Sequence, residues 1–600
     1  MLNDVVTGIM ATAAREPERT AVIDGRGRRI PYRELARRVE AVRAAMTAPP
    51  GGPEHPAGGS SPGNGAAGGA HPQDRAADGR PGDRAASGHR SGDRTAGGLR
   101  PGDGVLFAVR PGVDAVVLAL GAVAAGGTLV LADPGLAPGV LTARMAATRP
   151  RWVVAESLLY PLSGPLSGLA RRRGLLLPNL RAPLPGLPVR HLHTGPWLPG
   201  VPRGALRLSR ILRGSGAGRT GSVPPEDRTW PNLPTAPGAP VMSGADAPDM
   251  TEISPDQPAT VIFTSGTTAR PRGVVHTRGS LAAGLAMFHD AFPLGPGDVV
   301  HTDQLMLGLP ALLAGATWSL PGGGDLAGEL AARRATHAFA VPVHLDRLLR
   351  RTPRLPGTLR YLLLGAAPAP PAVLRRALAA GPEVLSVYAM TEALPIAIAS
   401  AREKLDHTGG DLLGTPLPGV GVRIADDGEL FVSGPHVAPR YLGEDPLEEV
   451  ATGDLVRLDG DRLVLLGRKK DMILRDGVNI YPGLYEPAVA ALPGVAEAAI
   501  VGITDPETGD EEVVLAVVAA EDYDEALLRR SLPRIVDAAA IPDRVEVVDD
   551  LPRSGRADKL DRAALRRVLA RPGKGPARDG SGPFPGRDEP GSPAGKGAAR

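Results

Sequence analysis

Short apolar segments that are bounded by Gly, Pro or Thr recur along the chain, and they constrain its fold more than any other feature. Clear examples are residues 104–109, 128–131, 259–264 and 359–365. Their uninterrupted apolar character is typical of strands that are buried on both faces. Several are separated by stretches with a helical period, as in residues 371–380. This alternation predicts an α/β fold with largely buried strands.

The pattern changes in the last third of the chain. After Leu430 the sequence favours hairpins, and after Asp471 a compact mixture of helical and strand patterns extends to about Leu569. We therefore predict a large N-terminal domain over residues 1–466 and a small α+β C-terminal domain over residues 467–570.

Three segments have the composition of disordered polypeptide. Gly (78 residues) and Pro (63 residues) are over-represented in the chain. Residues 49–99, residues 195–249 and the tail 571–600 hold much of this excess, and they cannot bury enough apolar surface to offset the entropy of ordering them. Within the first segment the motif Asp-Arg-Ala/Thr-Ala recurs, which is typical of a duplicated surface loop. We predict two disordered inserts and a disordered tail.

Charge, cysteine content and hydropathy exclude several classes of protein. The formal net charge is +3, so charge gives no reason to expect a nucleic-acid partner. The chain has no cysteine, which excludes disulfides, Cys-ligated metals and a thiol nucleophile. Residues 115–132 carry no charge, but Gly126 and Gly127 divide them into a helix-like and a strand-like half. We expect soluble core there rather than a membrane span, and a cytoplasmic protein, because the start of the chain does not have the pattern of a signal peptide.

The loop after the apolar segment 259–263 is the most informative motif. It reads Thr264-Ser-Gly-Thr-Thr-Ala-Arg-Pro-Arg-Gly273 and is dense in hydroxyls, glycines and cations. Backbone N–H groups and hydroxyls of such a loop can surround phosphate oxygens, and Arg270 or Arg272 can neutralise them. The spacing does not fit the P-loop motif, because the next glycine comes seven positions after Gly266 rather than five and no Lys follows it.

This loop resembles the phosphate loop of the adenylate-forming enzyme superfamily, which includes acyl-CoA synthetases, adenylation domains and luciferases. The likeness covers about residues 10–569 outside the inserts, and further family motifs follow in the family's order. The segments of this chain that resemble them are Leu362–Pro368, Tyr388–Glu392, Gly428–Pro435, Thr452–Asp454 and Gly467–Ile473. The chain most resembles fatty acyl-CoA synthetases, with some likeness to β-lactone synthetases. The resemblance implies a large N-terminal domain of layered sheets and helices with a distorted β-barrel, and a small mobile C-terminal domain.

The resemblance also implies cofactors and roles for individual residues. Family members let a carboxylate attack the α-phosphate of ATP in the presence of Mg²⁺, so the site must hold a polyanion and a hard cation. The implied ATP-binding residues are Thr264, Ser265, Gly266, Thr267, Thr268, Arg272, Gly365, Ala366, Ala367, Tyr388, Ala389, Met390, Asp454 and Arg468. The implied catalytic residues are Lys559, Glu392, Thr391 and Arg468. Glu392 and Thr264 are the implied Mg²⁺ ligands, and Lys470 is the implied hinge.

Several positions depart from the family pattern. Ala269 stands where the family usually has Gly, Arg272 where it usually has Lys, and Ala389 where it usually has Gly. An arginine keeps the charge of a lysine but replaces a compact ammonium with a planar fork, so phosphate binding is expected to persist with altered geometry. These departures keep open the alternative of a degenerate nucleotide or acyl-AMP binder without turnover.

The late catalytic lysine of the family has two candidate counterparts. Gly555-Arg556 preserves the Gly-Lys pair with an Arg substitution, whereas Lys559-Leu-Asp-Arg preserves the residues that flank the lysine. We favour Lys559, because a flexible ammonium must reach between the carboxylate and the α-phosphate and the downstream residues match better.

The residues before Thr317 bear on the substrate. In amino-acid adenylation domains this stretch supplies an acid for the substrate amine, but here Asp303 is the only acid and residues 304–316 are mostly apolar. They can line an apolar acyl pocket or belong to the core. The leading hypothesis is transfer of an apolar, fatty acyl group from acyl-AMP to CoA or an acyl carrier protein. A β-lactone synthetase acting on a β-hydroxy acid is the alternative.

Overall fold

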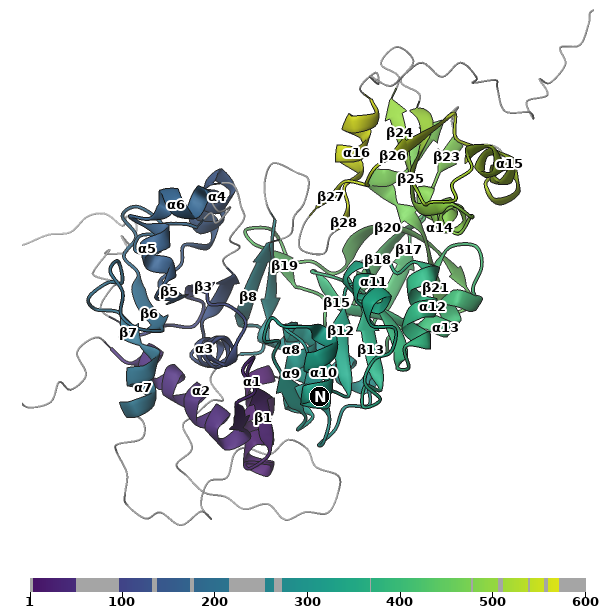
Figure 1. The fold of residues 1–600 in the computed structure, drawn as a ribbon. Helices are drawn as coiled ribbons and strands as arrows, with labels where there is room; N and C mark the ends of the chain where they lie inside the picture. Colours follow the sequence, from purple (N-terminus) through teal and green to yellow (C-terminus); the bar gives the residue numbers. More distant parts are fainter. Residues whose placement is uncertain are drawn as a thin grey trace, which may run out of the picture.

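The computed structural model describes eleven stretches of the chain: residues 4–49, 97–131, 138–172, 177–214, 254–263, 272–366, 368–475, 478–504, 511–537, 540–554 and 559–570. Two large sheets and a smaller C-terminal lobe organise these residues (Figure 1). The α/β prediction is confirmed, and the expected core segment 115–132 forms helix α3 (Val113–Ala124) followed by strand β4 (Thr128–Leu131). Among the described residues, no helix is long and apolar enough to cross a membrane.

An eight-stranded sheet forms one side of the N-terminal domain, with the strand order β19-β9-β8-β4-β3-β5-β6-β7. Strands β3, β4, β5, β6 and β8 run parallel, so their carboxyl ends share one edge and their amino ends the other. Besides β4, the strands are β3 (Gly104–Ala108), β5 (Trp152–Glu156), β6 (Arg190–Thr194), β7 (Leu206–Arg207), β8 (Pro258–Phe263), β9 (Gly273–Thr277) and β19 (Arg440–Tyr441).

The second sheet has thirteen strands in the order β17-β18-β20-β21-β16-β15-β14-β13-β12-β10-β11-β1-β2. Its antiparallel strands β16–β18, β20 and β21 pair in an open order and join the rest of the sheet through β15. The strands are β1 (Thr20–Ile23), β2 (Arg29–Pro31), β10 (Val299–His301), β11 (Thr317–Ser319), β12 (His337–Ala340), β13 (Tyr361–Leu364), β14 (Glu383–Met390), β15 (Ala393–Ser400), β16 (Asp411–Pro416), β17 (Gly421–Ile424), β18 (Glu429–Ser433), β20 (Val450–Asp459) and β21 (Arg462–Arg468).

Helices of the N-terminal domain pack on these sheets, and local sequence explains several of their ends. Asp4 caps α1 by accepting from the Thr7 backbone N–H, and Pro371 opens α12, where a missing N–H costs nothing. The helices besides α3 are α1 (Val5–Arg15), α2 (Tyr32–Thr47), α4 (Pro138–Thr148), α5 (Leu159–Ser163), α6 (Ser167–Arg172), α7 (Leu208–Gly214), α8 (Arg278–Ala291), α9 (Leu305–Leu313), α10 (Leu326–Arg333), α11 (Pro342–Arg351), α12 (Pro371–Ala379) and α13 (Ala401–Asp406).

The C-terminal lobe follows the short 3-10 helix η2 (Lys469–Asp471) and lies beside β20 and β21 (Figure 1). Its central sheet, β24-β25-β26, is covered on its two faces by separate clusters of buried apolar side chains. The elements are β22 (Ile473–Arg475), β23 (Val478–Ile480), α14 (Pro482–Ala490), β24 (Val495–Thr504), β25 (Glu511–Ala519), α15 (Glu525–Ile535), β26 (Arg544–Val548), β27 (Arg553–Ser554), β28 (Lys559–Leu560) and α16 (Arg562–Leu569).

The prediction of a disordered insert over residues 195–249 is wrong for its first part. Residues 195–214 are described, residues 206–214 fold as β7 and α7, and β7 pairs with β6 in parallel. Leu208 is buried, and Ile211 packs against the same core cluster. A few apolar side chains at helical spacing thus suffice to dock this segment, although its overall composition is rich in Gly, Pro and Arg. The insert residues 50–96 and 215–249 and the tail 571–600 lie outside the described residues.

Part of α9 belongs to the core. Leu307 and Ala311 belong to a buried cluster that includes Phe288, and Leu312 belongs to the largest core cluster. Leu305, Met306, Leu309 and Leu313 of the same helix are exposed or only partly buried, so lining of an acyl pocket by residues 304–316 stays a prediction. The Trp318 indole, which is 1% exposed, lies directly against the backbone of Gly308.

Substitution of Gly308 by alanine should therefore destabilise the protein. The added Cβ would lie 2.0 Å from the Trp318 ring, so the helix or the ring must move, at a cost of about 1–3 kcal/mol. We expect the thermal unfolding midpoint to fall by several degrees. Gly168→Ala is the matched control, because Gly168 is also helical but its Cβ would meet nothing within 4 Å. Equal midpoints for the two variants would contradict this packing.

Candidate active site

The predicted nucleotide residues come from segments at neighbouring ends of the two sheets. The loop 264–272 follows the carboxyl end of β8, and the turn 365–367 follows β13. Thr264, Ser265, Gly266, Thr267, Thr268 and Ala367 lie outside the described residues, as does Arg556. The geometry below therefore concerns the remaining candidates.

Asp454 lies at the centre of a buried polar cluster. It is 2% exposed and stands opposite Arg468 across the β20–β21 ladder. The Arg468 Nε lies 2.5 Å from Asp454 Oδ1, and the Tyr388 hydroxyl donates to Oδ2 over 2.7 Å. Burial raises the pKa of Asp454, while Arg468 and Tyr388 oppose that rise by favouring the carboxylate. No described group donates a well-aligned hydrogen bond to Oδ1, so this buried oxygen can accept one from a bound hydroxyl.

Tyr388 is held by β14 with its hydroxyl pointing at Asp454. Burial raises the pKa of Tyr388 far above its ordinary value, and the neighbouring carboxylate adds to the rise, so the hydroxyl stays protonated and donates. The resemblance implied a stacking role for its ring, and the hydrogen bond to Asp454 is an additional contact. Ala389 and Met390 continue the same strand, with Met390 opposite Ala393.

Ala366 adopts a strained backbone conformation in the turn after β13. Its φ of +70° lies in the left-handed region, which a residue with a Cβ rarely adopts. Such strain is characteristic of functional turns. The preceding residue is Gly365. A Cβ added there would lie 3.1 Å from the Phe339 ring, so a side chain at this position would crowd the ring.

Lys559 begins β28 and approaches this cluster from the C-terminal lobe. Its side chain is exposed overall, yet desolvation around the ammonium lowers its pKa, and the charges of Arg468 and Lys470 lower it further. Asp454 acts in the opposite direction. The structure thus brings three cations within electrostatic range of one buried carboxylate. That arrangement suits an anionic ligand bearing hydroxyl groups.

A cavity of about 380 Å³ adjoins Asp454. It is lined by Thr452, Gly453, Arg468, Lys469 and Lys470, from β20, β21 and η2. Lys469 is fixed by ion pairs with Asp427 and Glu429. Lys470, the predicted hinge, lies between the two domains in the chain and borders the cavity.

Glu392 occupies the turn between β14 and β15 and is 8% exposed. The Tyr441 hydroxyl of β19 donates to its Oε1 over 3.0 Å, so this contact joins the two large sheets. Burial, with the Glu392 charge added, raises the pKa of Tyr441 to about 12. The Arg272 guanidinium lies 3.5 Å from the centre of the Tyr441 ring and pairs with Glu444 over 2.6 Å. Arg272 is therefore engaged by protein groups beside Glu392.

His276 of β9 fixes the residue before Glu392. Its Nε2 lies 2.7 Å from the Thr391 carbonyl oxygen, and its Nδ1 lies 3.2 Å from the Ser280 hydroxyl. Burial lowers the pKa of His276, so the ring is neutral and its Nε2–H donates to Thr391. Sequence analysis missed His276, Tyr441 and Glu444, because each acts through a partner far away along the chain and none belongs to the quoted motifs.

The described carboxylates could supply only part of the ligands of a Mg²⁺ ion. Among the described residues there is no group of three or more His, Asp or Glu side chains that could hold a metal. Mg²⁺ commonly takes one or two protein carboxylates and completes its shell with phosphates and water. A single buried Glu392 beside a predicted phosphate loop fits that pattern.

The chain is similar to known proteins in sequence and in fold. A family model described as AMP-binding enzyme matches residues 94–442, and one described as AMP-binding enzyme C-terminal domain matches residues 485–557. A 2-succinylbenzoate–CoA ligase of Bacillus cereus is 31% identical over 379 residues, which is 58% of this chain and 78% of the relative. A feruloyl-CoA synthase of Amycolatopsis sp is 32% identical over 360 residues, 54% of this chain and 72% of the relative.

Solved structures share the fold. The amide bond synthetase McbA from Marinactinospora thermotolerans superposes with a TM-score of 0.67 at 24% sequence identity, covering 94% of this chain and 99% of that one.

Proposed function

The chain belongs to the AMP-binding enzyme family, and on that premise we propose that it is an ATP- and Mg²⁺-dependent acid–CoA ligase. In the first step a carboxylate oxygen of the substrate bonds to the α-phosphorus of ATP, the bond to the β-phosphate breaks, and pyrophosphate leaves. In the second step the CoA thiolate bonds to the acyl carbon and AMP leaves, which forms a thioester. Bound Mg²⁺ would neutralise phosphate charge in the first step.

The observation that carries this proposal is the meeting of Asp454, Tyr388, Arg468 and Lys559 from two domains. A buried carboxylate with an available oxygen is suited to accept the ribose hydroxyls of ATP. Lys559 would bridge the substrate carboxylate and the α-phosphate, where negative charge accumulates in the transition state.

The other predicted residues take their proposed places around this cluster. Residues 264–268 and Arg272 would bind the β- and γ-phosphates, residues 365–367 with Ala389 and Met390 the adenine, and Glu392 with Thr264 the Mg²⁺. Thr391 would be aligned by His276, and Lys470 would act as the hinge between the two steps.

We propose an aromatic or otherwise apolar acid as the substrate, rather than specifically a fatty acid. The two relatives above are named for succinylbenzoate and ferulate, which both carry an aromatic ring. The packing of Leu307, Ala311 and Leu312 of α9 into the core also leaves fewer apolar side chains there for a long acyl pocket.

A pyrophosphate-exchange assay over a panel of acids tests the proposal. The panel should contain 2-succinylbenzoate, ferulate and medium- and long-chain fatty acids, each without and with CoA, with products identified by mass. We expect exchange with at least one aromatic acid and a thioester when CoA is added. ATP binding without exchange for any acid would instead identify a degenerate binder, and a dehydrated β-lactone product without CoA would identify the alternative reaction.

The contact between Tyr441 and Glu392 predicts that loss of the Tyr441 hydroxyl weakens the response of the enzyme to Mg²⁺ without abolishing it. Tyr441→Phe keeps the ring under Arg272 but removes the hydroxyl that orients the carboxylate, a loss of about 1 kcal/mol or roughly fivefold. We expect a higher Mg²⁺ concentration for half-maximal exchange, with a smaller change in the maximal rate. Tyr361→Phe serves as control, because no described group bonds to the Tyr361 hydroxyl. An unchanged Mg²⁺ dependence would separate Tyr441 from the metal site.

A further inference from the structure

A second cavity, of about 540 Å³, lies at the opposite edge of the eight-stranded sheet. Its walls come from the three segments that enter the amino ends of β3, β5 and β6, namely residues 97–104, 148–152 and 188–190. The loop 264–272 follows the carboxyl end of β8, which runs parallel to these strands. The cavity is therefore separated from the candidate active site by the length of the sheet.

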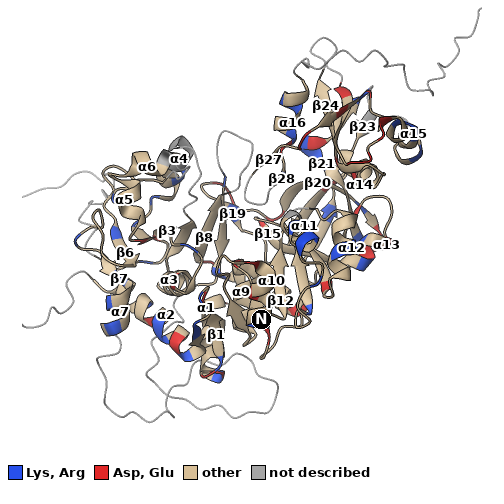
Figure 2. Ribbon diagram, viewed as in Figure 1, with Lys and Arg blue, Asp and Glu red and all other residues tan. Residues whose placement is uncertain are grey.

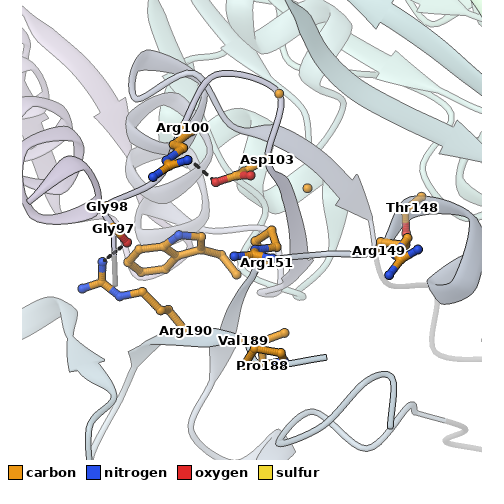
Figure 3. Close-up of a pocket in the computed structure, with 13 residues that line it drawn as sticks. Gly97, Gly98, Arg100, Asp103, Thr148, Arg149, Arg151, Pro188, Val189 and Arg190 are labelled. Atoms are coloured by element: carbon orange, nitrogen blue, oxygen red, sulfur yellow. Dashed lines mark hydrogen bonds between the residues drawn. The ribbon is translucent and has the colours of Figure 1, made fainter. Parts of the chain in front are cut away.

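Arginine side chains dominate this cavity. Arg100, Arg149, Arg151 and Arg190 line it, and Asp103 is its one acid among the described residues (Figure 3). The Asp103 carboxylate is occupied in part, because it accepts from the backbone N–H of Arg100 over 3.0 Å. The lining is thus strongly positive, and the volume is in the range of small-molecule sites.

Three of these arginines lack a carboxylate partner among the described residues, unlike the arginines of α2. On α2, basic and acidic side chains alternate and pair, as Arg37 does with Glu34 (Figure 2). Within the described part of the chain, by contrast, neither Arg100, Arg149 nor Arg190 forms an ion pair with a carboxylate. Like charges around one cavity repel, and the repulsion is relieved when an anion binds between them.

One of the arginines is held in place by the fold. The Arg190 guanidinium lies 4.5 Å from the centre of the Trp152 ring and donates to the carbonyl oxygens of Ala48 and Gly97, each over 3.2 Å. The backbone of Arg149 has φ +42°, an uncommon conformation for a residue with a side chain, in the turn that leads into β5. Arg190 covers the Trp152 ring, which is itself buried, so an aromatic ligand ring has no open face of Trp152 to stack on.

We propose that this cavity is a binding site for a phosphorylated small molecule that carries at least two negative charges, separate from the proposed catalytic site. Planar guanidinium groups bind phosphate oxygens in paired hydrogen bonds, and several of them are suited to a polyphosphate or a phosphate ester. The recognition is through the phosphate groups.

Calorimetric titration of the full chain with inorganic tripolyphosphate, and separately with ADP, tests this site. Because both ligands can also bind the proposed catalytic site, the affinities compared are those of the second binding event. We expect the double variant Arg100→Glu, Arg149→Glu to weaken tripolyphosphate binding by about tenfold or more, because two charge-assisted contacts are replaced by repulsion. Arg203→Glu is the control, an exposed arginine of the same domain that does not line the cavity. It should bind as the wild type does.

The two ligands separate the possible sources of the phosphate. Equal loss of tripolyphosphate and ADP affinity in the double variant would indicate recognition of phosphate alone. A larger loss for ADP would indicate a nucleotide site. Wild-type affinity in the double variant for both ligands would overturn the proposal, as would an equal loss in Arg203→Glu, which would indicate only general electrostatic attraction.

Discussion

Replacement of Lys559 by alanine is expected to lower the rate of adenylation by about 10²–10³-fold, the effect of removing one transition-state donor. The ammonium comes from β28 and lies within electrostatic range of the buried Asp454 and of Arg468. We propose that it bridges the substrate carboxylate and the α-phosphate only while the small domain is in this position. Thioester formation from supplied acyl-AMP should therefore survive the substitution, because on the proposed hinge role of Lys470 a rotation there would take Lys559 away. Stopped-flow measurement of the two half-reactions checks both expectations.

The pH profile gives an independent test of Lys559. Its pKa is lowered, so the charged form that adenylation needs is lost at a lower pH than for an ordinary lysine. Wild-type adenylation should decline on the alkaline side, and Lys559→Arg should extend activity to higher pH at a reduced rate. Arg556→Ala should be mild. A crippling effect of Arg556→Ala with a mild effect of Lys559→Ala would assign the role to Arg556.

Glu392→Gln is expected to reduce ATP-dependent activation by about 10²-fold, because it removes a buried carboxylate that we propose as a Mg²⁺ ligand. Glutamine has nearly the same size and can still accept from the Tyr441 hydroxyl, so the fold should be preserved. The Mg²⁺ requirement should rise sharply, and a titration of exchange rate against Mg²⁺ measures it.

The same substitution at an exposed glutamate separates an effect specific to Glu392 from the general effect of losing one negative charge. Glu448→Gln removes the same charge from an exposed position and should leave both rate and Mg²⁺ dependence unchanged. If Glu392→Gln behaves like Glu448→Gln, the metal role proposed for Glu392 is wrong.

Local patterns predicted much of the fold, because short buried strands and tight turns are encoded by consecutive residues. The apolar segment 128–131 forms β4, and residues 371–379 form α12 as expected. The docking of α7 was missed, since it depends on pairing of β7 with β6 rather than on local composition.

The candidate site was predictable only in part. Motif likeness marked Tyr388 and Asp454 separately, but their hydrogen bond joins residues 66 positions apart and depends on how β14 and β20 are arranged. The link from Tyr441 to Glu392 similarly crosses between two sheets. Such contacts are set by tertiary packing, which no local pattern encodes.

The hydrogen bonds from Arg190 to Ala48 and Gly97 have a consequence for how this chain can evolve. They place Ala48 and Gly97, which lie close to the two ends of the segment 50–96 in the sequence, next to the same side chain. The backbone N–H of Leu99 also donates to the Met46 carbonyl oxygen over 2.7 Å. The intervening sequence can therefore gain or lose repeat units without shifting any strand, and the entropic cost of closing a longer loop grows only slowly with its length. The repeated Asp-Arg-Ala/Thr-Ala units stand where duplication is least constrained by the core.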